Sequence, residues 1–180
     1  MKKKFYIAVV NREYKGVDRE WDIVSPVCTS QEDAEKFLNK EYESIFQKSS
    51  VNEENWDIVK EKETFSLISR NYNFWGWVHE VVCDYEEWEY NRFAYVVMSM
   101  IDMDDYDDSG NLNIGLVFTD KQSNSHRVDR LIDDLIHDFK VNFPSDDYTT
   151  LRYDWEAYAN FENNDVEGEL HIWYEIHDVI

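Results

Sequence analysis

The chain has 180 residues, of which 39 are Asp or Glu and 18 are Lys or Arg, so its formal net charge is −21 at pH 7. A surface this acidic repels phosphate groups, which excludes direct binding to nucleic acid or to an anionic membrane and favours cations and basic proteins as partners. Because 43% of the residues are hydrophobic and 16% are aromatic, the chain has enough apolar material to fold. The apolar run at the start ends at Asn11, too early for a signal peptide, so we expect a cytoplasmic protein.

The first half of the chain shows strand and helix patterns in a clear order. The predicted elements are strands at 5–10 and 21–24, a helix at about 31–47, and strands at 64–70 and 74–83. Ser30, followed by Asp33, resembles a capping box and predicts where the helix begins.

The second half repeats this order. The predicted elements are strands at 93–100 and 112–119, a helix that begins near Ser125 and ends before Pro144, and strands at 151–161 and 166–180. We therefore predict an α+β protein made of two tandem ββαββ units, each an antiparallel sheet with one packed amphipathic helix. The first unit is expected at 1–83, an acidic and aromatic linker at 84–91, and the second unit at 92–180.

The negative charge is concentrated in the second unit. Residues 1–90 contain 12 basic and 19 acidic residues, a net −7, whereas residues 91–180 contain 6 and 20, a net −14. In the last predicted strand the even positions are apolar, so the odd positions should share an exposed acidic face. Neighbours on that face lie about 6.6 Å apart, a spacing of the same order as that of phosphates along a nucleic-acid strand. The candidate partner-binding residues of this strand are Asp165, Glu167, Glu169, Trp173 and Glu175.

The second predicted helix carries a further set of acids opposite its apolar stripe. The candidates are Asp129, Asp133, Asp134 and Asp138, which form two like-charge pairs four residues apart. Each such pair destabilises a helix by about 0.2–0.5 kcal/mol. We interpret these repulsive pairs as lacking basic partners, which indicates that the acidity has a use, although adaptation to high salt would produce a similar pattern.

A possible metal loop is the other local pattern that carries chemistry. Asp105, Asp107 and Ser109 have the spacing of the first ligands of an EF-hand loop, but Leu116 stands where the bidentate Glu is required. No helix is predicted before this segment, so an acidic hairpin loop fits better than a calcium site. Trp75, Trp77 and the many carboxylates leave a carbohydrate-binding module open. No catalytic motif is present, so we expect neither an enzyme nor a cofactor.

The N-terminal segment resembles a known family. The run Phe5-Tyr6-Ile7-Ala8, then Tyr14-x-Gly16, then Trp21 and a helix that begins with acids, is similar to the N-terminal module of ArdA-type antirestriction proteins. Those proteins are very acidic DNA mimics that act on restriction enzymes. The similarity covers about 40 residues; it supports this class of function and transfers no functional residue.

These observations favour an acidic protein inhibitor that mimics nucleic acid and blocks the basic DNA- or RNA-binding surface of a nuclease, of an anti-restriction or anti-CRISPR type. The alternatives are an immunity protein or antitoxin that neutralises a cognate toxin nuclease, and a metal-ion or carbohydrate-binding module. The expected partner is a basic nucleic-acid-processing protein, and a homodimer is left open.

Overall fold

The chain divides into two compact units, Met1–Glu86 together with Asp178–Ile180, and Glu87–His177. The computed structural model describes residues 2–14, 20–51, 54–84, 92–103, 112–119, 125–145, 147–163 and 166–180. The second unit ends at His177 rather than Ile180, because the backbone N–H of Val27 donates to the carbonyl of Asp178 (2.9 Å) and that of Ile180 donates to the carbonyl of Val27 (3.0 Å). Of the expected linker at 84–91, Asp84 ends a strand and the rest lies outside the described residues.

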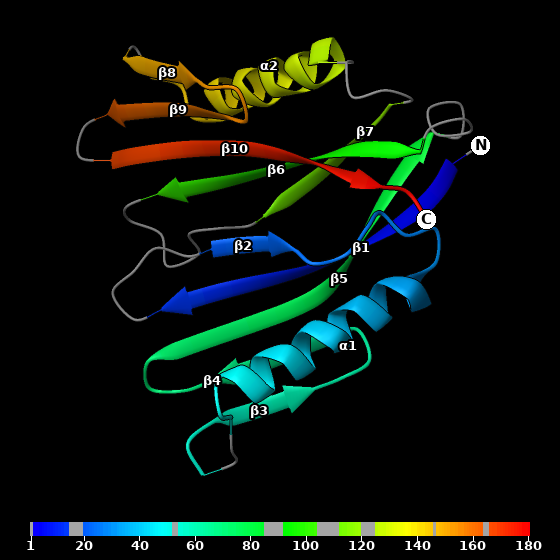
Figure 1. The fold of residues 1–180 in the computed structure, drawn as a ribbon. Coiled ribbons are helices and arrows are strands. Elements are labelled where there is room, and N and C mark those ends of the chain that lie inside the picture. Colours follow the sequence, from blue (N-terminus) through cyan, green and yellow to red (C-terminus); the bar gives the residue numbers. More distant parts are fainter. Residues whose placement is uncertain are drawn as a thin grey trace. The chain divides into compact units, whose positions relative to one another are not determined.

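The first unit is a five-stranded sheet with one helix. Its elements are β1 (Lys2–Tyr14), β2 (Glu20–Ile23), α1 (Gln31–Lys48), β3 (Asp57–Lys60), β4 (Thr64–Ile68) and β5 (Tyr72–Asp84). The strand order is β2-β1-β5-β4-β3, and α1 packs against one face of the sheet (Figure 1). The helix begins as predicted, because the hydroxyl of Ser30 accepts from the backbone N–H of Asp33 (3.2 Å) and donates to its carboxylate (2.7 Å).

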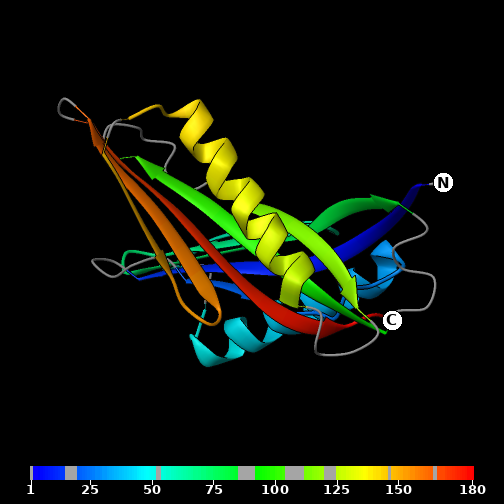
Figure 2. The same cartoon turned by 90° about the horizontal axis from the view of Figure 1, so that it is seen from above.

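The second unit has the same construction. Its elements are β6 (Phe93–Met103), β7 (Asn113–Thr119), α2 (Ser125–Asn142), β8 (Tyr148–Arg152), β9 (Glu156–Asn163) and β10 (Val166–Asp178). The strand order is β7-β6-β10-β9-β8, and α2 lies against one face of this sheet (Figure 2). The apolar stripe of α2, formed by Val128, Ile132 and Phe139, packs there on Leu170 and Ile172. No helix among the described residues is long and apolar enough to cross a membrane.

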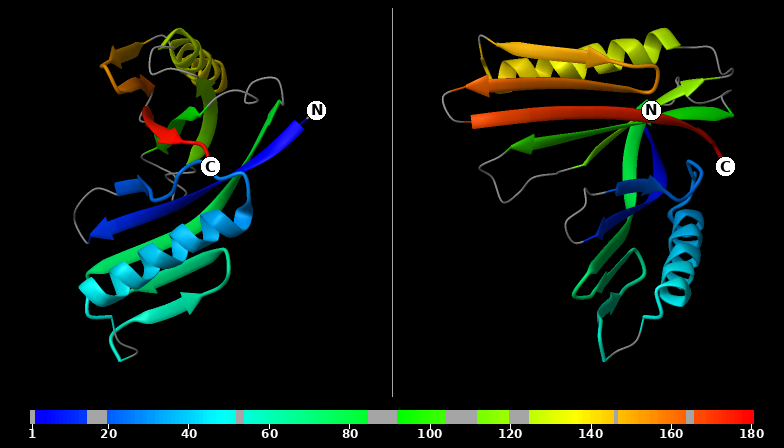
Figure 3. Two further views of the ribbon diagram at one scale, coloured as in Figure 1. Left: turned by 45° about the vertical axis from the view of Figure 1, so that its right-hand side comes forward. Right: turned by 60° about the vertical axis from the view of Figure 1, so that its left-hand side comes forward.

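The α+β class and the repeated element order are confirmed, but each unit contains one more strand than predicted. Both sheets have the same strand order when β1–β5 are matched with β6–β10 in sequence (Figure 3). The missed β3 is a four-residue edge strand with Val59 exposed, too short for a periodic pattern. The segment predicted as one strand at 151–161 is a hairpin, closed by a hydrogen bond from the N–H of Tyr153 to the carbonyl of Glu156 (2.8 Å). Of the residues typical of turns, this turn contains only Asp154, so its turn signal is weak.

A glycine in the last strand of each unit accommodates a phenylalanine ring. Gly76 of β5 lies opposite Phe65 of β4, and Gly168 of β10 lies opposite Phe161 of β9. A Cβ atom at Gly76 would come within 2.2 Å of the Phe65 ring, and one at Gly168 within 2.4 Å of the Phe161 ring. Because both phenylalanines belong to the helix-covered cores, this shared pair is further support for a duplication.

His79 should make the first unit sensitive to acid. It lies in β5 opposite Ile7 of β1, and its burial lowers the pKa of the imidazole below the ordinary value of about 6.5. Below that value the unfolded chain binds the proton more readily, so the free energy of unfolding should fall as the pH decreases through this range. We expect His79→Gln to remove this part of the pH dependence, as measured by urea unfolding at pH 7, 6 and 5.

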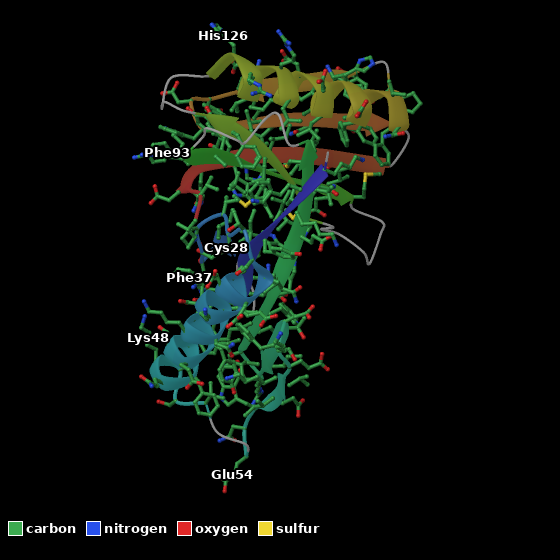
Figure 4. The ribbon with its side chains drawn as sticks, turned by 90° about the vertical axis from the view of Figure 1, so that its right-hand side faces the viewer. Cys28, Phe37, Lys48, Glu54, Phe93 and His126 are labelled. Carbon is green, nitrogen blue, oxygen red and sulfur yellow. The ribbon has the colours of Figure 1, made fainter. Side chains whose placement is uncertain are left out.

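The matched control is His126→Gln, since His126 is exposed near the start of α2 (Figure 4). That substitution should leave the pH dependence of unfolding unchanged. An unaltered pH dependence in the His79→Gln variant would mean that the burial of this ring does not contribute to acid sensitivity.

Candidate functional site

The last strand of the second unit presents an acidic side, as its alternation predicts. Leu170 and Ile172 are 3% and 0% exposed and belong to the core under α2, whereas Glu167 and Glu175 are exposed on the other side of the sheet. We call this other side the helix-free face. In the register of β10 with β9, it comprises Glu167, Glu169, His171, Trp173 and Glu175 of β10, and Glu156, Tyr158, Asn160 and Glu162 of β9. Asp165 lies outside the described residues.

One end of the helix-free face forms a hollow lined by carboxylates, which we call the acidic hollow. Its acidic residues are Asp102 of β6, Asp147 just before β8, Glu162 of β9, and Glu167 and Glu169 of β10. The hollow has a volume of about 540 Å³, within the range of ligand pockets, but small-molecule pockets are mainly apolar. A hollow lined by carboxylates is instead suited to bind positively charged groups on the surface of a partner protein.

The acidic hollow is not neutralised from within the described part of the chain. None of the described residues that line it is basic, and none of the described Lys, Arg or His side chains pairs with its five carboxylates. Glu162 and Glu167 lie directly opposite each other on paired strands, an arrangement that destabilises a sheet. A positively charged partner would relieve this repulsion.

The other end of the helix-free face is aromatic. The rings of Tyr158 and His171 stack with centroids 4.3 Å apart, and those of His171 and Trp173 lie 4.7 Å apart. The Tyr158 hydroxyl donates to Glu156 (2.9 Å). Burial, that hydrogen bond and the nearby negative charges raise the pKa of Tyr158 to about 12, so it remains a neutral donor. Trp173 therefore lies on the face of β10 that the alternation predicts, where it forms an aromatic row with His171 and Tyr158.

Three of the four acids of α2 are exposed as predicted, but two of the four have a basic partner that was not predicted. Asp133, Asp134 and Asp138 are exposed, but Asp129 and Asp133 do have a basic partner. Arg152 of β8 places one nitrogen 3.1 Å from the Asp133 carboxylate and donates from another to the backbone carbonyl of Asp129 (3.0 Å). The expectation that this pair lacks a basic partner is wrong, because the partner comes from another element and not from the helix itself.

The structure does not bring the two acidic sets together. The apolar stripe of α2 faces the core, so Asp134 and Asp138 point away from it on the helix side of the second unit. Glu167 and Glu169 lie on the opposite side of the same sheet. The two sets therefore do not form one continuous surface, and the helix-free face is the one where carboxylates from several strands converge.

A metal site has no support in the described part of the chain. The candidate ligands Asp105, Asp107 and Ser109 lie outside the described residues. Among the described residues, no group of three or more His, Cys, Asp or Glu side chains could hold a metal ion.

Comparison with known proteins gives no match to a family model, to a curated protein or to a solved structure. We therefore infer function from the geometry and charge of the helix-free face.

Two sets of residues on this face were missed by the sequence prediction. Asp102 and Asp147 lie far from β10 in the chain, Glu162 lies just after the segment predicted as one strand at 151–161, and Tyr158 and Glu156 lie within that segment. Alternation along residues 156–162 separates Glu156, Tyr158 and Glu162 from Ala157, Ala159 and Phe161. That pattern could have placed the β9 residues on a polar face, and the turn-favouring sequence Asn163-Asn164-Asp165 between the two predicted strands indicates that they lie beside β10.

Proposed function

We propose that this chain is a non-catalytic inhibitor that occupies the basic DNA- or RNA-binding surface of a nuclease, of the restriction or CRISPR kind, through the helix-free face of its second unit. The observation that carries the proposal is the acidic hollow, where five carboxylates gather without a basic partner among the described residues. Stability alone gives no reason to gather them, because like charges on neighbouring strands repel.

The spacing of these carboxylates suits a surface that binds phosphates. Glu167 and Glu169 are two residues apart on one strand, about 6.6 Å, and Glu162 faces Glu167 from the next strand, roughly 5 Å away. A nucleic-acid strand presents charges every few ångströms along its axis. Lysines and arginines arranged to bind phosphates can therefore reach several of these carboxylates at once.

The charge of the whole chain assists the encounter. A net charge of −21 attracts a basic protein over long range and speeds association, an effect that weakens as salt is added. The expected binding is therefore fast and sensitive to salt.

The proposal is tested by capture followed by competition. The immobilised full chain is incubated with cell lysate at 0.05 M salt, and bound proteins are eluted with a salt gradient and identified by mass spectrometry. We expect nucleic-acid-processing proteins that elute as the salt rises and that are displaced by an excess of double-stranded DNA or of RNA, with polyglutamate as the control anion.

Competition is the deciding measurement. If a captured protein binds its nucleic acid and the chain at the same time, the chain does not occupy the nucleic-acid surface and the proposal is wrong. A captured nuclease should also lose activity in proportion to the amount of chain added.

A further inference from the structure

The aromatic row of the helix-free face continues onto β8. Leu151 lies directly opposite Tyr158 in the register of β8 with β9, and the ring of Tyr153 meets that of Tyr158 edge-on at a centroid distance of 6.3 Å. Both of these additional side chains are open to solvent, with Leu151 46% and Tyr153 58% exposed. We call the row and its continuation the aromatic patch, which consists of Leu151, Tyr153, Tyr158, His171 and Trp173. Tyrosine and tryptophan are enriched at the centres of protein interfaces.

The strand register places the aromatic patch beside the acidic hollow on one surface. Glu162 pairs with Glu167 at the acidic end, and Tyr158 pairs with His171 four residues further along the same two strands. Four residues of a strand span about 13 Å at ~3.3 Å per residue. A partner that covers both regions must therefore present cationic groups and groups that bind rings about 13 Å apart.

The rings of the aromatic patch are held in a stack, as nucleic-acid bases are. Tyr158 and His171 lie 4.3 Å apart and are 9° from parallel, and Trp173 continues the stack at 4.7 Å from His171 with a tilt of 35°. Because each ring is fixed by its neighbour, little side-chain entropy is left to lose when a partner binds. Tyr153, at the open end, is the most exposed ring of the patch.

Surfaces that bind single-stranded nucleic acid have the two complementary features. They combine a positively charged groove along the backbone with aromatic side chains on which the bases stack. A surface that binds duplexes needs no such side chains, because it contacts phosphates and the base edges in the grooves. We infer that the partner surface is one that binds single strands, and that the aromatic patch contacts its base-stacking side chains. This inference rests on the proposed function and names the kind of nucleic-acid surface that is occupied.

Three peptides of equal charge test whether the patch accepts aromatic side chains next to cations. Each contains five lysines, which alternate with four tryptophans, four leucines or four alanines, and each is titrated with the full chain at 0.15 M salt. We expect the tryptophan peptide to bind about ten-fold more tightly than the alanine peptide and about three-fold more tightly than the leucine peptide. The reason is that stacked aromatic pairs are stabilised beyond the burial of their apolar area.

Two variants of one hairpin locate the effect. Leu151→Ser with Tyr153→Ser removes the exposed part of the patch and should reduce the preference for tryptophan over alanine to about two-fold. Trp155→Ser is the matched control, because this ring is 61% exposed in the same hairpin but contacts Tyr174, which packs on the core at the helix side of the sheet. The control should keep the full preference. Thermal unfolding of both variants verifies that the second unit remains folded.

The captured partner provides a second readout that needs no variant. A single-stranded oligonucleotide of mixed sequence should displace the chain at a lower nucleotide concentration than a duplex of the same sequence. An abasic strand of equal length keeps the phosphates and lacks the bases, so it should compete about ten-fold less well than the mixed strand.

The outcomes separate this inference from the proposed function. Three results would each overturn the inference and leave the acidic hollow intact: equal affinity for the tryptophan and leucine peptides, a preference that the Trp155→Ser control loses as much as the patch variant, and a duplex that competes better than the single strand. A partner that no nucleic acid displaces would overturn the inference and the proposed function together.

Discussion

Replacing Gly168 with valine should lower the free energy of unfolding of the second unit by about 1–3 kcal/mol, the range found for overpacked cores. A Cβ atom at this position would lie 2.4 Å from the Phe161 ring and 2.7 Å from the sulfur of Met103. Phe161 is 7% exposed and packs against Phe139, Phe143 and Tyr148, so its ring cannot move aside without disturbing the core. Thermal unfolding of the full chain, combined with hydrogen exchange resolved by peptide, measures the effect in each unit.

Two other glycines make the comparison specific. Gly115→Ala is the control, because the nearest atom to a Cβ there is the end of the Leu131 side chain at 3.3 Å, and its effect should stay within about 0.5 kcal/mol. Gly76→Val should reproduce the loss in the first unit, where the added atom would meet the Phe65 ring at 2.2 Å. Equal stability of the Gly168 and Gly115 variants would show that the phenylalanine ring does not require the glycine.

The local part of the fold could be predicted because periodicity is a property of neighbouring residues. Leu170 and Ile172 face the core and Glu167 faces away, as the period-two pattern of β10 requires. The apolar stripe of α2 likewise identified Val128 and Ile132 as core residues. These predictions need only the direction in which successive side chains point.

The assembled site could not be predicted, because it depends on strand order and register. The turn-favouring residues between Glu162 and Glu167 indicate that the two lie on neighbouring strands. Nothing local in Asp102 or Asp147 indicates that they line the same hollow. The pairing of Arg152 with the acids of α2 has the same origin, since β8 and the helix meet only in the folded unit. Alternation can place a charge on a face, but contacts between strands decide which charges share it.

Reversing two charges on the helix-free face should weaken binding to a basic partner much more than reversing two on α2. Glu167→Lys with Glu169→Lys changes the acidic hollow, and Asp134→Lys with Asp138→Lys changes exposed acids that are not paired with Arg152. Each double variant changes the net charge by the same amount, so long-range attraction is matched. At 0.15 M salt we expect a loss of affinity for nona-lysine, or for the captured partner, of about 100-fold in the first and about three-fold in the second.

The salt dependence of the binding affinity of these two variants shows whether the position of the charges or only the net charge determines binding. If close pairs form in the acidic hollow, the hollow variant should show a flatter decline of affinity between 0.05 and 0.3 M salt, while the helix variant keeps the slope of the unaltered chain. Equal losses in both variants would mean that only the total charge matters and that no face is preferred. A larger loss of affinity in the helix variant would indicate that the partner binds the side of α2 that carries Asp134 and Asp138.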